Sequence, residues 1–193
     1  ADRVRGCGMA VSMQGSGIAG VDTASVLLKL NDDGWFTLSH GATDMGQGSD
    51  TVLAQIAAEV LEVELGRIVV ASFDLDTLPY DGGAYASSGA YVTGRATLEA
   101  AGDMVLQVRA AAAGMLGVPA DEVRYAGGVC TAADGREVGL EALARRLASF
   151  AGRGQLVSVG TFGSATSPPP FMAGFAEVEV DLRTGAVRLI DFV

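Results

Sequence analysis

The residues with the clearest chemical potential lie in two glycine- and serine-rich loops. The first is GATDMGQGSDT at 41–51 and the second is DGGAYASSGAYVTG at 81–94, each leading from a predicted strand region into a predicted helix. The first N–H groups of a helix have no partners within it and carry partial positive charge, and glycines let a ligand approach the backbone closely. Both loops are therefore candidate sites for an anion or phosphate, although many loops of this kind only cap a helix.

Gln47 stands between Gly46 and Gly48 in the first loop. Its amide can both donate and accept hydrogen bonds, and neighbours without side chains leave room for a bulky partner. The alternative is a solvated loop glutamine. Neither loop matches the Gly-x-x-x-x-Gly-Lys-Ser/Thr or Gly-x-Gly-x-x-Gly fingerprints of nucleotide-binding proteins, so nucleotide hydrolysis is disfavoured.

The single histidine and the two cysteines have simpler structural interpretations. His40 ends a predicted strand beside the first loop, where it could touch substrate or cofactor, but a hydrogen-bonded strand-end residue is the favoured interpretation. Cys7 and Cys130 are far apart and form no Cys-x-x-Cys pair, so neither a zinc site nor a disulfide framework is encoded. No second histidine is present to activate Cys7 as a nucleophile. Both cysteines are expected to be buried free thiols.

Acidic and aromatic residues cluster around the second loop. Three acids could bind a hard cation, but they lack the spacing of an EF-hand, and acids are common in turns: Asp74, Asp76 and Asp81. Three tyrosines could line a pocket for an aromatic substrate or simply pack across a cleft: Tyr80, Tyr85 and Tyr91.

The elements that must position these loops follow from the hydrophobic pattern. Residues 24–40 predict a hairpin with its turn at 31–34, and residues 49–65 predict an amphipathic helix capped by Ser49 or Asp50. Further segments predict, in order, a strand, a long helix with small residues on one face, a hairpin, a helix and a strand: 67–73, 93–116, 123–132, 140–150 and 156–163.

The C-terminal part reads as a stiff connector followed by two alternating strands. The connector is SATSPPP at 164–170, and the strands in 171–193 flank the turn Arg183-Thr184-Gly185. The sum is an α+β fold of mixed and antiparallel sheets with packed helices. Residues 1–193 are taken as one fragment with a possible subdomain boundary near 164–170. The last strand runs to the final residue without a cap, which is typical of a chain cut from a longer one.

Composition excludes several classes of protein. The chain has 193 residues, 49% of them hydrophobic and 19% charged, which suffices to bury a core in one domain or two small ones. A formal charge of -10 has the wrong sign for neutralising nucleic-acid phosphates. No apolar run approaches the ~20 residues that cross a bilayer, and the N-terminus lacks a signal-peptide layout. We expect a cytoplasmic protein without nucleic-acid or membrane partners.

Taken in order and spacing, these segments resemble the molybdenum-cofactor-binding subunit of the xanthine dehydrogenase and aldehyde oxidase family, which includes nicotinate dehydrogenase and 4-hydroxybenzoyl-CoA reductase. The resemblance rests on HGATDMGQGSDT, on D-T-x-x-x-P-Y-D-x-G-A-Y-A-S-S and on the Thr-Gly that opens the next predicted helix, and it covers most of the chain. It implies a molybdenum hydroxylase, an oxidoreductase that hydroxylates or dehydroxylates a heterocyclic, aldehyde or aromatic substrate.

The resemblance also implies site residues. In the family the glutamine of Gly-Gln-Gly hydrogen-bonds the apical oxo ligand of molybdenum, a role that falls on Gln47 with Gly46 and Gly48 beside it. Contacts to the pterin fall on three residues of the second loop: Ala86, Ser87 and Ser88. Gly89 stands where xanthine oxidoreductases have a second serine, so this departure puts one hydroxyl contact in doubt. No residue is expected to be a direct metal ligand.

Other parts of such an enzyme are not in this sequence. The family's glutamate general base lies in a Gly-Glu motif farther downstream, and the iron–sulfur and flavin modules that carry electrons onward are absent. The resemblance therefore implies a parent that binds Mo-molybdopterin, either as such or as the cytosine dinucleotide. Its partners would be the rest of the molybdenum subunit, iron–sulfur and flavin subunits or domains and a small-molecule substrate. This chain alone is expected to retain no cofactor and to be inactive. The alternative is a non-catalytic acidic α+β module that binds a small anion or a protein.

Overall fold

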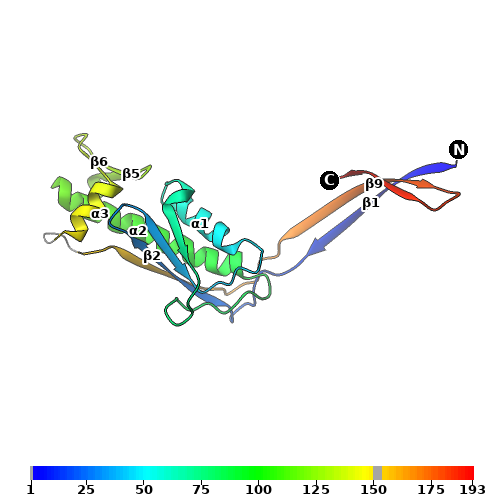
Figure 1. The fold of residues 1–193 in the computed structure, drawn as a ribbon, viewed down its shortest axis with the longest axis horizontal. Coiled ribbons are helices and arrows are strands. Elements are labelled where there is room, and N and C mark those ends of the chain that lie inside the picture. Colours follow the sequence, from blue (N-terminus) through cyan, green and yellow to red (C-terminus); the bar gives the residue numbers. More distant parts are fainter. Residues whose placement is uncertain (1, 150–153) are drawn as a thin grey trace. The chain divides into compact units, whose positions relative to one another are not determined.

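The computed structural model describes residues 2–149 and 154–193 of the chain. Two compact units are present, one of residues 17–166 and one that joins residues 1–16 to residues 167–193. The larger unit contains the three α-helices found in the described residues together with two sheets, and the smaller unit is a single sheet (Figure 1). The assignment of residues 1–193 to one fragment with a possible subdomain boundary near 164–170 stays a prediction.

A four-stranded sheet forms one layer of the larger unit, with strand order β4-β3-β2-β8. β2 alternates buried and half-buried residues along its length, as a strand with one face on a core must. The predicted hairpin is confirmed, because β2 and β3 pair antiparallel, whereas β4 lies parallel to β3. Helices packed on mixed sheets are also confirmed. The strands are β2 (Thr23–Leu30), β3 (Phe36–His40), β4 (Ile68–Ala71) and β8 (Val157–Gly163).

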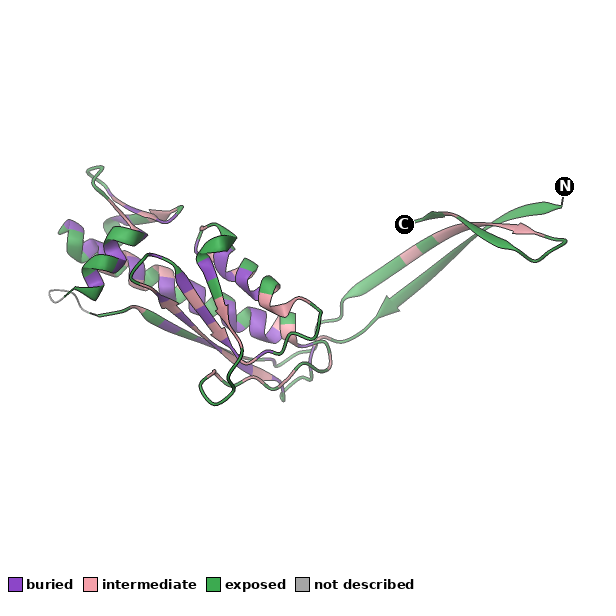
Figure 2. Ribbon diagram, viewed as in Figure 1, coloured by how far each residue is buried: buried purple, intermediate pink, exposed green. Residues whose placement is uncertain are grey.

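Small residues let the helices approach this sheet and one another closely. Gly160 of β8 lies so near α2 (Gly89–Leu116) that a Cβ there would stand 2.0 Å from the carbonyl oxygen of Ala96. A Cβ on Gly94 of α2 would stand 3.0 Å from Cδ1 of Ile56, on the neighbouring helix α1 (Ser49–Val60). Figure 2 shows the buried residues gathered where α1 and α2 meet the sheet.

Both long helices begin at the same end of the larger unit (Figure 1). The N-cap of α1 is Gly48, at φ 79° and ψ 26°. The predicted caps, Ser49 and Asp50, are instead the first two residues of the helix. Glycine adopts this left-handed conformation without steric cost. α1 ends at Val60, five residues earlier than predicted, because Glu62 also turns into the left-handed region. α2 begins at Gly89, four residues earlier than predicted, and ends at Leu116 as predicted, because its C-cap Gly117 takes a left-handed φ of 68°.

A second, smaller sheet and a third helix complete this unit. The hairpin predicted at 123–132 is confirmed, and its chain turns through Gly127 and Gly128, both at positive φ. α3 (Leu140–Ala148) confirms the predicted helix, whose expected last residue, 150, lies outside the described residues. The sequence did not predict the third strand of the sheet or two 3-10 helices, Leu65–Arg67 and Ala120–Glu122. The strands are β5 (Val123–Ala126), β6 (Val129–Ala132) and β7 (Glu137–Gly139).

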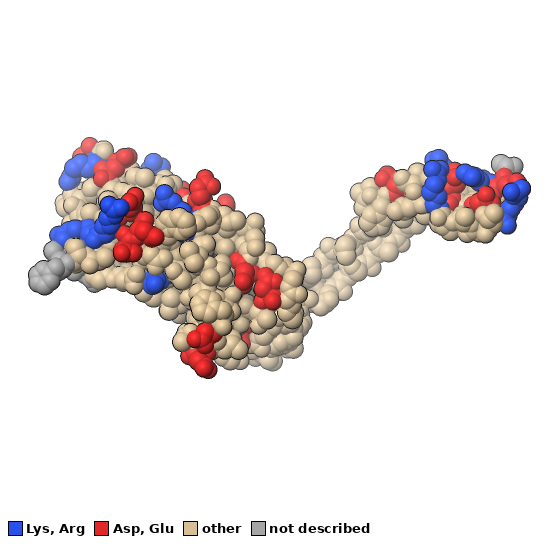
Figure 3. All heavy atoms as spheres, in the orientation of Figure 1, with Lys and Arg blue, Asp and Glu red and all other residues tan. Residues whose placement is uncertain are grey.

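The smaller unit is a three-stranded antiparallel sheet with β9 (Phe171–Asp181) between β1 (Arg3–Met13) and β10 (Val187–Phe192). β9 and β10 are the two predicted C-terminal strands, whereas β1 was not predicted. Charged residues gather at one end of the sheet and the strands show uncharged atoms elsewhere (Figure 3). Ion pairs cross the strands there: Arg3–Glu179 at 3.1 Å, Arg5–Glu177 at 3.2 Å and Arg188–Glu179 at 3.2 Å.

The two cysteines occupy opposite environments. Cys130 of β6 is buried, as predicted. The expectation of a buried thiol is wrong for Cys7, which is exposed because every residue of β1 is exposed in this sheet. Among the described residues, no helix combines the length and apolar character that crossing a membrane requires.

Candidate functional site

Gln47 lies on the surface of the first loop with its amide folded back onto the loop itself. Its Oε1 accepts a hydrogen bond from the backbone N–H of Met45 at 2.6 Å. Its Nε2 donates to the carbonyl oxygen of Thr43 at 2.9 Å and to Oγ of Ser49 at 3.2 Å. All hydrogen bonds of this amide are therefore made within its own loop, and none joins it to another helix or strand. The amide can turn outward by giving up these contacts within the loop.

Asp44 organises the backbone around Gln47. Its carboxylate accepts hydrogen bonds from the N–H groups of Gly46 at 2.8 Å, Gly48 at 3.4 Å and Asp50 at 3.2 Å. These donors lower the pKa of Asp44 below its usual value. The sequence analysis did not single out Asp44, although an aspartate two residues before a glycine is the usual signature of a side chain that caps its own turn.

The two glycines beside Gln47 leave open space. Gly46 has a φ of 99° and Gly48 a φ of 79°, both in the left-handed region. A Cβ added to either one would meet no atom within 4 Å. Their conformation, and not packing within the protein, therefore calls for glycine, and the surface around the Gln47 amide is not filled by the described part of this chain.

Behind the first loop, His40 is completely buried at the end of β3. Its Nε2 lies 3.5 Å from Oδ1 of Asp50, whose Oδ2 accepts a hydrogen bond from Oγ of Ser72 at 3.0 Å. Burial lowers the pKa of His40, and the nearby charges of Asp50 and Asp81 and the backbone of Ala42 oppose this shift. The predicted strand-end position is confirmed, but neither ring nitrogen has a hydrogen-bond partner among the described residues.

The second loop holds two consecutive residues in an unusual backbone conformation. Ala86 has a φ of 48° and Ser87 a φ of 56°, which residues with a Cβ rarely adopt. The carbonyl oxygen of Ala86 accepts a hydrogen bond from the N–H of Gly17 at 2.7 Å, and Oη of Tyr85 donates to Asp22 at 2.6 Å. That second bond raises the pKa of Tyr85. No local pattern could have predicted Asp22, because this contact spans 63 residues.

Ser88 is buried and faces the interior of its own loop. Its hydroxyl donates to the carbonyl oxygen of Tyr85 at 2.9 Å and does not cap α2. The first turn of α2 contains no acidic residue either. The positive end of this 28-residue helix is therefore not offset by a carboxylate of its own first turn.

The structure brings the bases of the two loops together. A Cβ on Gly41 would lie 2.7 Å from the carbonyl oxygen of Pro79 and 3.0 Å from Cβ of Asp81, so only glycine fits at this crossing. Asp81 then fixes the second loop, because its carboxylate accepts from the N–H of Gly83 at 2.8 Å and from Oγ1 of Thr93 at 2.7 Å. Two loops that are 40 residues apart in sequence thus share one edge of the larger unit.

The other clusters do not form sites. Asp74 accepts a hydrogen bond from the N–H of Asp76 at 3.1 Å and caps its own turn, and Asp81 faces Thr93. Within residues 2–149 and 154–193, no group of three acids, histidines or cysteines is placed to hold a metal ion.

The three tyrosines take different partners and do not line one pocket. Tyr85 bonds Asp22, Tyr91 packs edge-on against Phe162 with ring centroids 5.6 Å apart, and Tyr80 is 67% exposed. Tyr91 fits the interpretation as a packing residue, whereas Tyr80 and Tyr85 are both exposed.

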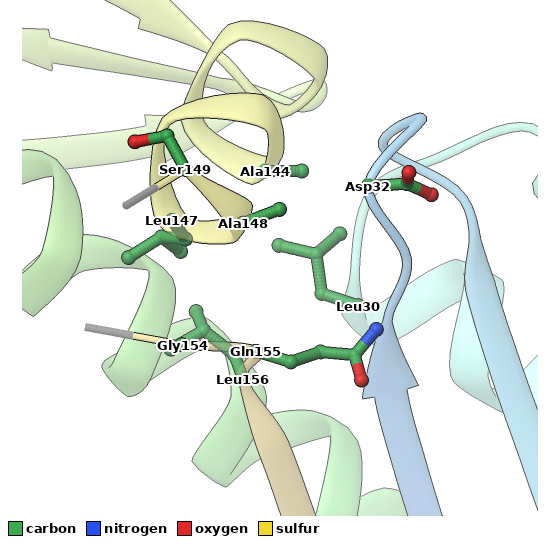
Figure 4. Close-up of a pocket in the computed structure, with 9 residues that line it drawn as sticks. All are labelled: Leu30, Asp32, Ala144, Leu147, Ala148, Ser149, Gly154, Gln155 and Leu156. Atoms are coloured by element: carbon green, nitrogen blue, oxygen red, sulfur yellow. The ribbon is translucent and has the colours of Figure 1, made fainter. Parts of the chain in front are cut away.

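One pocket of about 490 Å³ lies away from both loops, between the turn after β2, the end of α3 and the segment before β8 (Figure 4). Asp32 is the only charged residue among those that line it, and the rest are apolar or small polar residues. It offers no pair of groups for acid–base or nucleophilic chemistry.

Comparison with known proteins gives a family for this arrangement. The model of a family described as the molybdopterin cofactor-binding domain matches residues 1–193. The chain is 39% identical over 188 residues to the probable hypoxanthine oxidase XdhD of Escherichia coli (strain K12), covering 97% of this chain and 20% of that protein. It is 33% identical over 176 residues to the xanthine dehydrogenase molybdenum-binding subunit of Escherichia coli O157:H7, covering 88% of this chain and 23% of that protein.

Solved structures share the fold. The quinoline 2-oxidoreductase of Pseudomonas putida 86 superposes with a TM-score of 0.81 at 23% identity, covering 99% of this chain and 26% of that one. The reconstituted CO dehydrogenase of Oligotropha carboxidovorans superposes with a TM-score of 0.83 at 23% identity, covering all of this chain and 26% of that one. The chain thus spans about a fifth to a quarter of the length of the proteins it resembles.

Proposed function

This chain belongs to the molybdopterin cofactor-binding domain family, and we propose that it supplies two loops of the cofactor site in a larger molybdenum hydroxylase. Both loops lie at one edge of the larger unit, and both include residues in left-handed conformations on an open surface. This shared edge is the observation that carries the proposal. Alone, the chain retains no cofactor and catalyses nothing in this proposal.

Gln47 fits a role beside the metal. Its amide is exposed, its present partners all lie in its own loop, and the glycines on either side leave the space next to it open. In the proposed site Gln47 donates its N–H to a ligand of the metal, and Asp44 holds the loop backbone while the amide turns outward. When bound, Mo-molybdopterin would supply the redox centre for a hydroxylation that takes its oxygen atom from water, or for the reverse reaction, which releases that oxygen as water.

The second loop fits the organic part of the cofactor. The left-handed conformations of Ala86 and Ser87 keep the chain from starting the helix early and bring the backbone to the surface ahead of α2. A helix start without an acidic residue in its first turn favours an anionic ligand such as a phosphate. Ser88 contributes by supporting this conformation from inside, through its bond to Tyr85.

The remaining parts of the proposed enzyme lie outside these residues. We infer that the parent passes electrons to iron–sulfur and flavin subunits or domains and that its substrate is a heterocyclic, aldehyde or aromatic molecule. We also infer the cytosine dinucleotide form of the cofactor. Nucleotide analysis of the denatured enzyme tests this last point, because CMP is released from the dinucleotide and not from molybdopterin itself.

The central experiment measures the cofactor in the parent. The complete molybdenum subunit, produced with its partner subunits, is expected to contain molybdenum and pterin in a ratio of about one to one with the protein. Protein that is folded but lacks both would sink the proposal and leave the acidic binding module as the function.

Gln47→Ala tests the role of the amide. It should lower kcat by about tenfold or more, as the loss of one well-placed donor does elsewhere, or lower the molybdenum content. Gln55→Ala is the matched control, since Gln55 is an exposed glutamine on α1. Wild-type activity and wild-type molybdenum content in the Gln47 variant would remove this residue from the site.

A further inference from the structure

His40 is a buried titratable residue that the proposed function does not use. Its side chain has no exposed surface, and both ring nitrogens lack hydrogen bonds to the described residues. Its Nε2 lies 3.5 Å from Oδ1 of Asp50, and this oxygen is likewise buried without a hydrogen-bond partner. Buried polar groups are nearly always paired, because an unpaired one loses its hydration and gains nothing in return. Two such groups that face each other therefore need an explanation.

The pair closes the base of the first loop. His40 is the last residue of β3, and Asp50 is the second residue of α1, so the two side chains meet where the loop leaves the sheet and enters the helix. Asp50 also accepts a hydrogen bond from Ser72, just beyond the end of β4, and its N–H donates to Asp44. Asp50 thus connects the sheet to the carboxylate that shapes the loop around Gln47.

We propose that His40 is a positioning residue for Gln47, acting through Asp50. A neutral imidazole that donates its Nε2 hydrogen to Oδ1 of Asp50 pairs two of the three unpartnered atoms after a movement of a few tenths of an ångström, and Nδ1 is then the ring's free acceptor. This contact fixes the base of the loop while the Gln47 amide exchanges its present partners, which all lie within the loop, for a ligand. The inference rests on the proposed function for its effect on activity, but not for its effect on the loop.

The charge of His40 is set by groups on both sides. Burial disfavours the imidazolium, while the carboxylates of Asp50 on α1 and Asp81 on the second loop favour it. His40 therefore lies within the electrostatic reach of both loops. Protonation changes its contact with Asp50 from a neutral hydrogen bond to an ion pair, so the order of the loop should depend on pH.

The experiment uses the complete molybdenum subunit and two substitutions of similar size. His40→Gln keeps a neutral donor near the position of Nε2, and His40→Leu removes both nitrogens. Hydrogen exchange of the amides at 44–50 is measured in protein without cofactor, and kcat and KM are measured in the loaded enzyme. Thr97→Val is the matched control, because Thr97 is a fully buried polar residue of α2 away from the loop.

His40→Leu should speed exchange at 44–50 by about tenfold and lower kcat by about tenfold to a hundredfold with little change in KM, as misplacement of a group beside the reacting centre does. His40→Gln should restore both to within a few-fold of the wild type, and Thr97→Val should change neither. Exchange and kcat at wild-type values in His40→Leu would overturn the proposal, as would equal losses in the Gln and Leu variants. If the subunit binds no molybdenum, the proposed function fails. Faster exchange at 44–50 in His40→Leu would still support the positioning role of His40 in that case.

A second measurement keeps the test decisive if His40→Leu does not fold. After correction for intrinsic exchange, protection of residues 44–50 in the wild type should change as the pH falls below 6.5, the ordinary pKa of histidine. In His40→Gln the same protection should stay constant over this range. Identical pH profiles in the two proteins would exclude His40 as the residue that controls the loop.

Discussion

His40 and Asp44 hold the first loop by different physical means. Asp44 is exposed, and the N–H groups that point at its carboxylate lower its pKa, so it stays ionised to below pH 3.8. His40 is buried, and desolvation lowers its pKa, so its ring stays neutral at neutral pH. The loop therefore combines one negative charge on its surface with one buried group whose pKa lies below the ordinary value of histidine.

The buried state of His40 predicts how stability depends on pH. In the unfolded chain the ring takes up a proton near pH 6.5, whereas in the folded chain it does so only at lower pH. The unfolded state therefore binds more protons in this window, and the contribution of His40 to the free energy of unfolding declines from pH 6.5 downward until the folded-state pKa is reached. Urea unfolding of wild type and His40→Gln at about pH 7.5 and about pH 5.5 measures this decline.

The loss of stability between these two pH values should be larger in the wild type than in His40→Gln. The carboxylates that change protonation near the lower pH are common to both proteins, so they cancel in the comparison. Equal losses would mean that the folded state accepts a proton on His40 as readily as the unfolded state does.

The environments of the two cysteines predict different reactivity. Burial raises the pKa of Cys130 to about 11, so almost no thiolate forms there at pH 8. Cys7 is exposed on β1. Iodoacetamide at about pH 8 should modify Cys7 in the folded chain and Cys130 only after denaturation, as peptide mass spectrometry can measure. Equal labelling of both cysteines in the folded chain would contradict the buried position of Cys130.

At the scale of elements, most of the fold could be predicted because its pattern is local. Alternating residues and the turn at 31–34 predict the β2–β3 hairpin, and small residues every three or four positions predict α2. β1 was not predicted because its glycines and alanine are poor strand formers, and it becomes a strand through eleven pairings with β9. The first residue of α1 was predicted correctly, but its N-cap was not, because a left-handed glycine and not a polar side chain ends the loop.

The candidate site divides in the same way. Gln47, Ala86 and Ser87 could be selected from sequence because their motifs are contiguous and resemble a known family. Their present contacts could not be predicted, because a side chain that folds back on its own loop leaves no pattern in the sequence. The crossing of the loops at Gly41 and the contact of Tyr85 with Asp22 depend on tertiary structure alone.

The contact between β8 and α2 predicts the cost of one added methyl group. Gly160→Ala would put a Cβ 2.0 Å from the carbonyl oxygen of Ala96 and 2.6 Å from the N atom of Ala100, both backbone atoms of α2 that cannot turn aside. The helix must then move off the sheet, which should lower the free energy of unfolding by about 3 kcal/mol or more. Chemical denaturation of the chain measures the change.

Gly163→Ala is the control on the same strand. A Cβ there would lie 3.8 Å from Oγ1 of Thr23, an ordinary contact, so this variant should stay within about 0.5 kcal/mol of the wild type. Equal effects at the two positions would show that α2 does not pack on β8 as closely as the structure indicates.

At the scale of the whole molecule, the smaller unit exposes one continuous apolar sheet face. Residues directly opposite each other share a face, and the register places apolar or small residues along the whole of this one, with no charge between its two ends. Exposed fractions are 69% for Met172, 66% for Phe192 and 60% for Leu189, and the central valines of β9 are half-buried. The face consists of Val4, Gly6, Gly8, Ala10 and Ser12 of β1, Met172, Gly174, Ala176, Val178 and Val180 of β9, and Val187, Leu189 and Phe192 of β10.

An uninterrupted apolar face of this kind predicts the behaviour of the 193-residue chain in isolation. Contiguous exposed apolar surface favours self-association and binds hydrophobic dyes. The chain should therefore bind anilinonaphthalene sulfonate while its far-UV circular dichroism remains that of a folded protein, and it should associate as its concentration rises in sedimentation experiments. Leu189→Lys should weaken both effects, because it places a charge in the centre of the face opposite Val178. Leu106→Lys is the control, because it replaces an equally exposed leucine on α2 and should leave dye binding and association unchanged. A monomeric wild type without dye binding, or equal effects of the two lysine substitutions, would contradict this account of the face.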